Sequence, residues 1–89
     1  MSNKTPIPHI TMQINERFFQ CVDDLCNRRI IRGLGTLAKQ WDVSRFILTW
    51  SKHHPQETSI KIEYIYYLVR DYDVSLDWIF FGKGPMYKL

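Results

Sequence analysis

The sequence has no long apolar run. None approaches the roughly 20 consecutive apolar residues that a membrane-spanning helix needs. The first ten residues, MSNKTPIPHI, lack the apolar core of a signal peptide. We therefore expect a protein without a membrane segment that stays in the cytoplasm.

Cysteine is scarce, and no metal-binding spacing is present. The two cysteines, Cys21 and Cys26, are five residues apart on one predicted helix, so their thiols do not point the same way. We expect both to be reduced and structural, with Cys26 on the apolar face and Cys21 on its flank. His53 and His54 are adjacent, whereas zinc-binding histidines on one helix are typically four residues apart. These patterns predict no metal ion and no cofactor.

Catalytic and phosphate-binding motifs are also lacking. The sequence shows no pairing of Cys with His, and no pair of carboxylates at a spacing that would indicate catalysis, so we do not expect an enzyme. The segment Gly82-Lys83-Gly84 is too short for a phosphate-binding loop, and no helix is predicted after it. With 89 residues the chain forms one domain. We therefore expect no sensor domain, and the sequence makes no small-molecule ligand evident.

Positive charge is concentrated in one part of the chain. Between Arg28 and His54, six basic residues accompany a single acidic residue, Asp42, so this segment carries a net charge of +5. The rest has six basic and eight acidic residues, a net charge of −2. Clustered basic charge is typical of a surface that faces phosphates.

The charged segment contains two predicted short helices, in residues 34–53, LGTLAKQWDVSRFILTWSKH. Between them Asp42 tolerates a positive φ and Ser44 is a strong N-cap, which predicts a tight turn. The first helix has an apolar side formed by Leu34, Leu37, Ala38 and Trp41. In the second helix, the residues expected to face inward are Ile47, Leu48 and Ser51. The residues expected to face outward are Arg45, Phe46, Thr49, Trp50 and His53.

Three further helices complete an all-α, five-helix prediction. The first runs from Glu16 to about residue 29 and is capped by Asn15. The fourth runs from residue 60 to about 72 after a Ser59 cap, and the last covers residues 76–81 between Ser75 and Gly82. Residues 1–14 are expected to form a flexible arm, and residues 15–89 the folded domain.

Several motifs resemble those of the lambda-repressor-like helix-turn-helix family. They are Leu37-Ala38-Lys39, Val43-Ser44, Val74-Ser75-Leu76-Asp77-Trp78 and Gly82-Lys83-Gly84-Pro85-Met86. The chain is especially similar to small bacterial and phage repressor-type regulators, and the similarity covers roughly residues 16–87. It departs from the family pattern at Asp42, where glycine is usual, and at Ser51, where isoleucine or tryptophan is usual.

The resemblance implies a small transcriptional repressor that binds double-stranded DNA in a sequence-specific manner. The helix at residues 44–53 would lie in the major groove, with Arg45 pairing with a guanine or a phosphate and Phe46 touching a thymine methyl group. The residues expected to contact DNA are Thr36, Lys39, Ser44, Arg45, Phe46, Thr49, Trp50, Lys52 and His53.

Two interactions with proteins are also predicted. The outward face of the second short helix is unusually apolar for a base-reading surface, so the alternative is a protein-interaction module on a helix-turn-helix scaffold that no longer binds DNA. The segment 76–81 is apolar around its whole circumference, which indicates burial on more than one side. It could form a homodimer interface with Tyr66 or Tyr67, or it could simply be part of the core.

Overall fold

The described part of the chain is all-helical, as predicted. The computed structural model describes residues 9–88, which contain five helices and no β-strand, only an isolated bridge between Val74 and Tyr87. None of these helices combines the length and the apolar character needed to cross a membrane. The helices are α1 (His9–Asn27), α2 (Leu34–Trp41), α3 (Arg45–His53), α4 (Ile62–Tyr72) and α5 (Leu76–Phe81).

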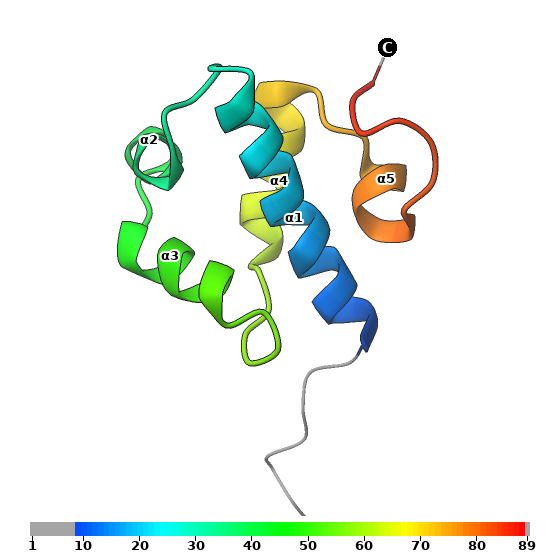
Figure 1. Ribbon diagram of the computed structural model, residues 1–89, viewed down its shortest axis with the longest axis horizontal. Helices are drawn as coiled ribbons and strands as arrows, with labels where there is room; N and C mark the ends of the chain where they lie inside the picture. Colours follow the sequence, from blue (N-terminus) through cyan, green and yellow to red (C-terminus); the bar gives the residue numbers. More distant parts are fainter. Residues whose placement is uncertain (1–8, 89) are drawn as a thin grey trace, which may run out of the picture.

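Helix α1 is the central element of the arrangement. It crosses the molecule diagonally, with α2 and α3 on one side, α5 and the C-terminal tail on the other, and α4 behind it (Figure 1). All five helices supply side chains to one apolar core. Its largest fully buried members include Phe18, Leu25, Leu37, Leu48, Leu68 and Ile79.

The predicted start of α1 is wrong. The helix begins at His9, and Asn15 lies inside it with 2% exposure instead of capping it. The Asn15 side chain donates to the carbonyl groups of Pro55 and Thr58 and accepts from the Ile60 N–H. Asparagine is often a helix cap because its side-chain amide forms hydrogen bonds with nearby backbone groups. Here the same amide group forms its hydrogen bonds with a distant segment. Residues 9–14, which were expected to belong to a flexible arm, are therefore helical. The rest of the expected arm, residues 1–8, lies outside the described residues.

The predicted helix ends are otherwise largely confirmed. Asp42 and Asp73 end α2 and α4 in the left-handed region, with φ of 56° and 55°, and Gly82 ends α5 with φ of 67°. The hydroxyl oxygens of Ser44 and Ser75 accept hydrogen bonds from the third residue of the helices that follow. Short-range chemistry therefore determines most of these boundaries.

Two local predictions are wrong. Ser59 does not cap α4, which begins at Ile62 after Lys61, a residue that makes no side-chain cap bond. Cys21 is fully buried and Cys26 only partly buried, the reverse of the expected order. Burial raises the pKa of the Cys21 thiol to about 11, which keeps it protonated and weakly nucleophilic.

The C-terminal tail fastens α5 to α1. The bridge with Val74 places Tyr87 so that its hydroxyl group donates to the Asp24 carboxylate at 2.7 Å. From α1, the Arg17 guanidinium donates to the carbonyl oxygen of Ile79 at 2.9 Å. Nothing in the local sequence indicates these contacts, because each joins residues more than 60 positions apart.

Leu48 tests the register of α3. Leu48→Ala should lower the free energy of unfolding by about 2–5 kcal/mol, because it removes a fully buried side chain and leaves a cavity. The neighbouring substitution Ile47→Ala is the matched control, and it should cost much less because Ile47 is 45% exposed. Urea denaturation of both variants measures the difference. Equal losses would contradict the observed register.

Candidate nucleic-acid interface

Helices α2 and α3 form a pair joined by the three residues 42–44. The N–H groups of Asp42 and Val43 both donate to the carbonyl oxygen of Ala38, so the chain reverses immediately after α2. The Ser44 hydroxyl oxygen then accepts from the Ile47 N–H and starts α3. The short-turn helix pair predicted from the sequence is therefore present.

A polar cluster holds α2 against α4. The Asp71 carboxylate accepts hydrogen bonds from the Trp41 indole N–H and from the Gln40 amide, both at 2.9 Å. The neighbouring Arg70 guanidinium donates to the same carboxylate, and together with Trp41 and Gln40 it lowers the pKa of Asp71 to about 2. The Trp41 ring also packs against Tyr67, with ring centroids 5.5 Å apart. The helix pair thus has a defined position on the core.

The outward face of α3 is exposed and largely aromatic. Leu48 and Ser51 are buried, as predicted. Phe46 is 73% exposed and Trp50 is 37% exposed. Ile47, which was expected on the inward face, is 45% exposed and lies at the edge of that face.

Arg45 lies at the side of α3 that meets α2. Its side chain extends along Gly35, so closely that a Cβ atom at Gly35 would sit 3.5 Å from Arg45 Nε. Lys39 is exposed on α2, whereas Thr36 in the first turn of α2 is partly buried. Arg45, Lys39 and the exposed Ser44 thus all belong to the short-turn pair, with both cationic residues open to solvent.

The other predicted contact residues are distributed over different sides of α3. Lys52 is partly buried, and its Nζ lies 3.2 Å from the Asp23 carboxylate of α1, so its charge already has a partner. Trp50 stacks on His54 with ring centroids 4.0 Å apart. Thr49 is partly buried and His53 is exposed. The nine predicted residues therefore do not form one uniform patch.

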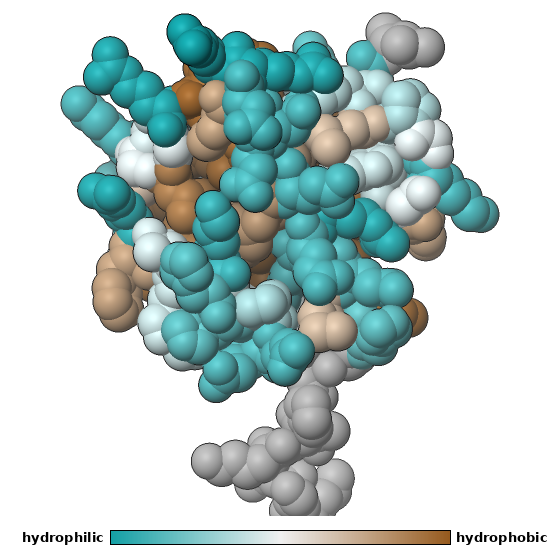
Figure 2. Space-filling model, in the orientation of Figure 1, coloured by the Kyte–Doolittle hydropathy of each residue, from teal (hydrophilic) through white to brown (hydrophobic). Residues whose placement is uncertain are grey.

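Much of the clustered basic charge remains available at the surface. Arg28 pairs with Asp24 at 2.9 Å. In residues 9–88, no ion pair involves Arg29, Arg32, Lys39 or Arg45, and all four are exposed. Figure 2 shows hydrophilic side chains over most of the face formed by α1 and α3, with hydrophobic residues showing between α2 and α1.

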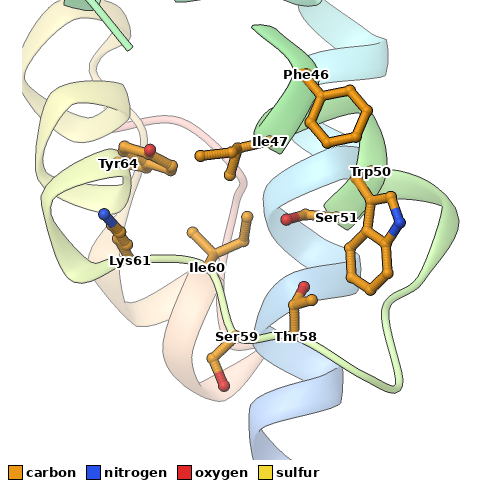
Figure 3. A pocket seen from close by; sticks show the side chains of 9 residues that line it. All are labelled: Phe46, Ile47, Trp50, Ser51, Thr58, Ser59, Ile60, Lys61 and Tyr64. Carbon is orange, nitrogen blue, oxygen red and sulfur yellow. The ribbon is translucent and has the colours of Figure 1, made fainter. Parts of the chain in front are cut away.

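A hollow adjoins the aromatic side of α3 and was not predicted. It measures about 240 Å³ and lies between α3, the segment 58–61 and the start of α4 (Figure 3). Phe46, Ile47 and Trp50 line it from α3, and Ile60 and Tyr64 line it from the other side. Sequence patterns could not reveal it, because the connection after α3 is brought there by Asn15, a residue of α1.

Comparisons with known proteins do not assign a family or a function to the chain. No family model, curated protein or solved structure matches the chain. Among residues 9–88, no cluster of three or more His, Cys, Asp or Glu side chains could hold a metal ion.

Asn15 tests how the connection after α3 is held. Asn15→Ala removes one acceptor and one amide donor group, leaving the Ile60 N–H and two carbonyl groups without that partner. We expect a loss of about 2–4 kcal/mol in the free energy of unfolding, since the buried Ile60 N–H left unsatisfied costs about 1–3 kcal/mol and the two part-buried carbonyl groups cost less. Gln20→Ala, an exposed change on the same helix, is the control. A variant as stable as the control would show that the connection does not depend on Asn15.

Proposed function

We propose that the protein is a small transcriptional repressor that binds double-stranded DNA, with α3 in the major groove. The observation that carries this proposal is an exposed face on α3, in a short-turn pair whose cations Lys39 and Arg45 make no ion pair within residues 9–88. A helix pair with so short a turn is the unit that places a recognition helix in DNA. The five helices in this order also support a lambda-repressor-like arrangement, which is part of the same proposal.

Specific roles follow from position on the helix. Arg45, in the first turn of α3, is placed to reach a guanine edge or a phosphate, and the exposed Phe46 can contact a thymine methyl group. Ser44 and the first N–H groups of α3 can hold a phosphate at the positive end of the helix. Arg32 and Lys39 supply attraction that does not depend on sequence. Lys52 is a weaker candidate than the sequence suggested, because Asp23 neutralises it.

The aromatic face of α3 favours a second candidate function. Phe46, Ile47 and Trp50 are large apolar residues of one helix that are exposed and line the hollow. Exposed aromatic residues next to a hollow are also typical of protein-binding surfaces, where tryptophan often dominates the binding energy. The alternative is therefore a protein-interaction module that uses the same helix.

The DNA-binding proposal predicts different effects for two exposed cations. After selection of a binding site from random duplex DNA, Arg45→Ala should weaken binding to that site by about 1–3 kcal/mol and relax preference at one base pair. Lys39→Ala should weaken all sequences alike and lower the slope of log K against log salt by about 0.9. Fluorescence anisotropy titrations at two salt concentrations measure both effects. Lys83→Ala, on an exposed residue two positions after the end of α5, is the control and should change neither.

The same titrations separate the two candidate functions. If no sequence is enriched and wild type shows only weak, salt-labile affinity for duplex DNA, the groove proposal fails and the protein-binding alternative is favoured. Trp50→Ala then distinguishes them further. If α3 binds DNA, Trp50→Ala should weaken DNA binding only modestly, through lost shape contacts. If α3 binds a protein, the same change should weaken binding to that partner by about 2 kcal/mol or more.

We also propose that the repressor binds DNA as a homodimer through α4 and α5. Four large apolar side chains of these helices are exposed, Ile62, Tyr66, Leu76 and Phe81, at 49–69%. Tyr66, Leu76 and Phe80 line an apolar groove between the two helices. Tyr67 instead packs partly buried against Trp41, so Tyr66 is the tyrosine available for the interface. Core burial accounts for Ile79 but not for Leu76 or Phe81.

Sedimentation tests the dimer. At micromolar concentration the wild type should sediment as a dimer, and Leu76→Glu should shift it to a monomer, because the charge would be buried without a partner. Ile10→Glu, at an apolar residue on α1 that is 66% exposed, is the matched control and should stay dimeric. A monomer at every concentration, with DNA or without, would contradict the interface.

A further inference from the structure

The hollow beside α3 combines apolar walls with two polar groups at its edges, the Thr58 hydroxyl group near Trp50 and Lys61 on the other side of Ile60 (Figure 3). Ile47 and Tyr64 face each other across its upper part, Ile60 projects into its centre, and the Trp50 ring closes one side (Figure 3). The Trp50 ring is fixed by its stack on His54 and by the bond between His54 Nδ1 and the Trp50 carbonyl oxygen. The shape is therefore preformed, as ligand pockets usually are.

Two polar groups of the hollow have no protein partner. The Thr58 hydroxyl oxygen is buried and, alone among the buried side-chain polar atoms of residues 9–88, makes no hydrogen bond. In Figure 3 it is turned toward Ser51 and Trp50. Lys61 also lines the hollow, and no ion pair in the described residues includes it. Buried polar groups are normally hydrogen-bonded, so an unpaired hydroxyl group beside an open space indicates a missing partner.

We infer that the hollow is a binding site for a small aromatic carboxylic acid. A planar ring matches the apolar walls formed by Ile47, Ile60 and Trp50. A carboxylate matches Lys61, the one charged side chain among the described residues that line the hollow. The Thr58 hydroxyl group lies on the other side of Ile60 and would not share that carboxylate (Figure 3). Among the described residues, no acidic side chain lines the hollow, so an anion would meet no repulsion from these walls.

The hollow has room for a single ring with a short chain, or for a small bicyclic ring. A dry apolar cavity of about 150 Å³ holds benzene. The hollow, at about 240 Å³, has room for the ring and a two- or three-carbon acid. The α4–α5 groove is of similar size, about 270 Å³, and equally apolar, but no lysine lines it. It serves as an internal comparison for binding that depends on apolar contact alone.

Ligand binding would act on the proposed DNA-binding surface. Phe46 and Trp50 belong both to the hollow and to the exposed face of α3, so an occupied hollow changes the surface that α3 presents. This consequence rests on the proposed function, whereas the binding site itself does not. A titration with the ligand tests the binding site, and a titration with DNA tests the proposed function. One of the two can therefore fail without the other.

The experiment is a titration of the ¹⁵N-labelled protein with 3-phenylpropanoate, followed by two-dimensional NMR. We expect saturable shifts at Trp50, Thr58 and Lys61, and at least tenfold weaker binding of the neutral analogue 3-phenylpropan-1-ol. Lys61→Met, which keeps the apolar stem and removes the charge, should weaken binding of the acid about tenfold, as expected for a hydrogen bond to a charged group. Lys83→Met is the matched control and should bind as wild type does.

Several results would overturn the inference. Shifts that do not saturate, or that centre on Ile62 and Leu76 in the α4–α5 groove, would show nonspecific apolar binding. Equal affinity for the acid and the alcohol, or equal behaviour of the two lysine variants, would show that Lys61 does not recognise a carboxylate. The hollow would then not be a site for aromatic carboxylic acids.

Discussion

The hydrogen bonds of one buried side chain, Asn15, determine how the two halves of the structure meet. The side-chain amide of Asn15 forms hydrogen bonds with three backbone groups in the connection between α3 and α4, those of Pro55, Thr58 and Ile60. This contact holds the connection that runs from the end of α3 to the start of α4 against α1. It also forms the wall of the hollow, because Thr58 and Ile60 line it. The shape of the surface beside α3 thus depends on a residue of a different helix.

Local signals in the sequence predicted most of the fold. The caps at Ser44 and Ser75 and the left-handed residues Asp42 and Gly82 involve neighbours within a few positions, so α2, α3 and α5 could be placed almost residue by residue. Asn15 is the exception. Its side-chain amide, which was expected to cap a helix, instead forms a tertiary contact with residues 40 or more positions away. The additional helical turns of α1 were missed for this reason.

The candidate site was predictable only in part. The exposed positions of Arg45, Phe46 and His53 follow from the helical period. The pairing of Lys52 with Asp23, and the stacking of Trp50 on His54, depend on where α1 and the following connection pass. Helix α3 consequently has a cationic side toward α2 and an aromatic side toward the hollow, a division that helical periodicity alone does not reveal.

The contact between Arg17 and Ile79 has a consequence for how the chain is made. It spans 62 residues, and the entropy of closing a loop rises with its length. A ribosome that adds about 5–20 residues per second needs roughly 3–12 seconds to synthesise that interval. For most of this time the residues of α1 have been synthesised but α5, which packs against it, does not yet exist. The nascent chain must therefore shield the apolar side of α1 with α2 to α4 alone, and the native state is reached only when the final helix emerges.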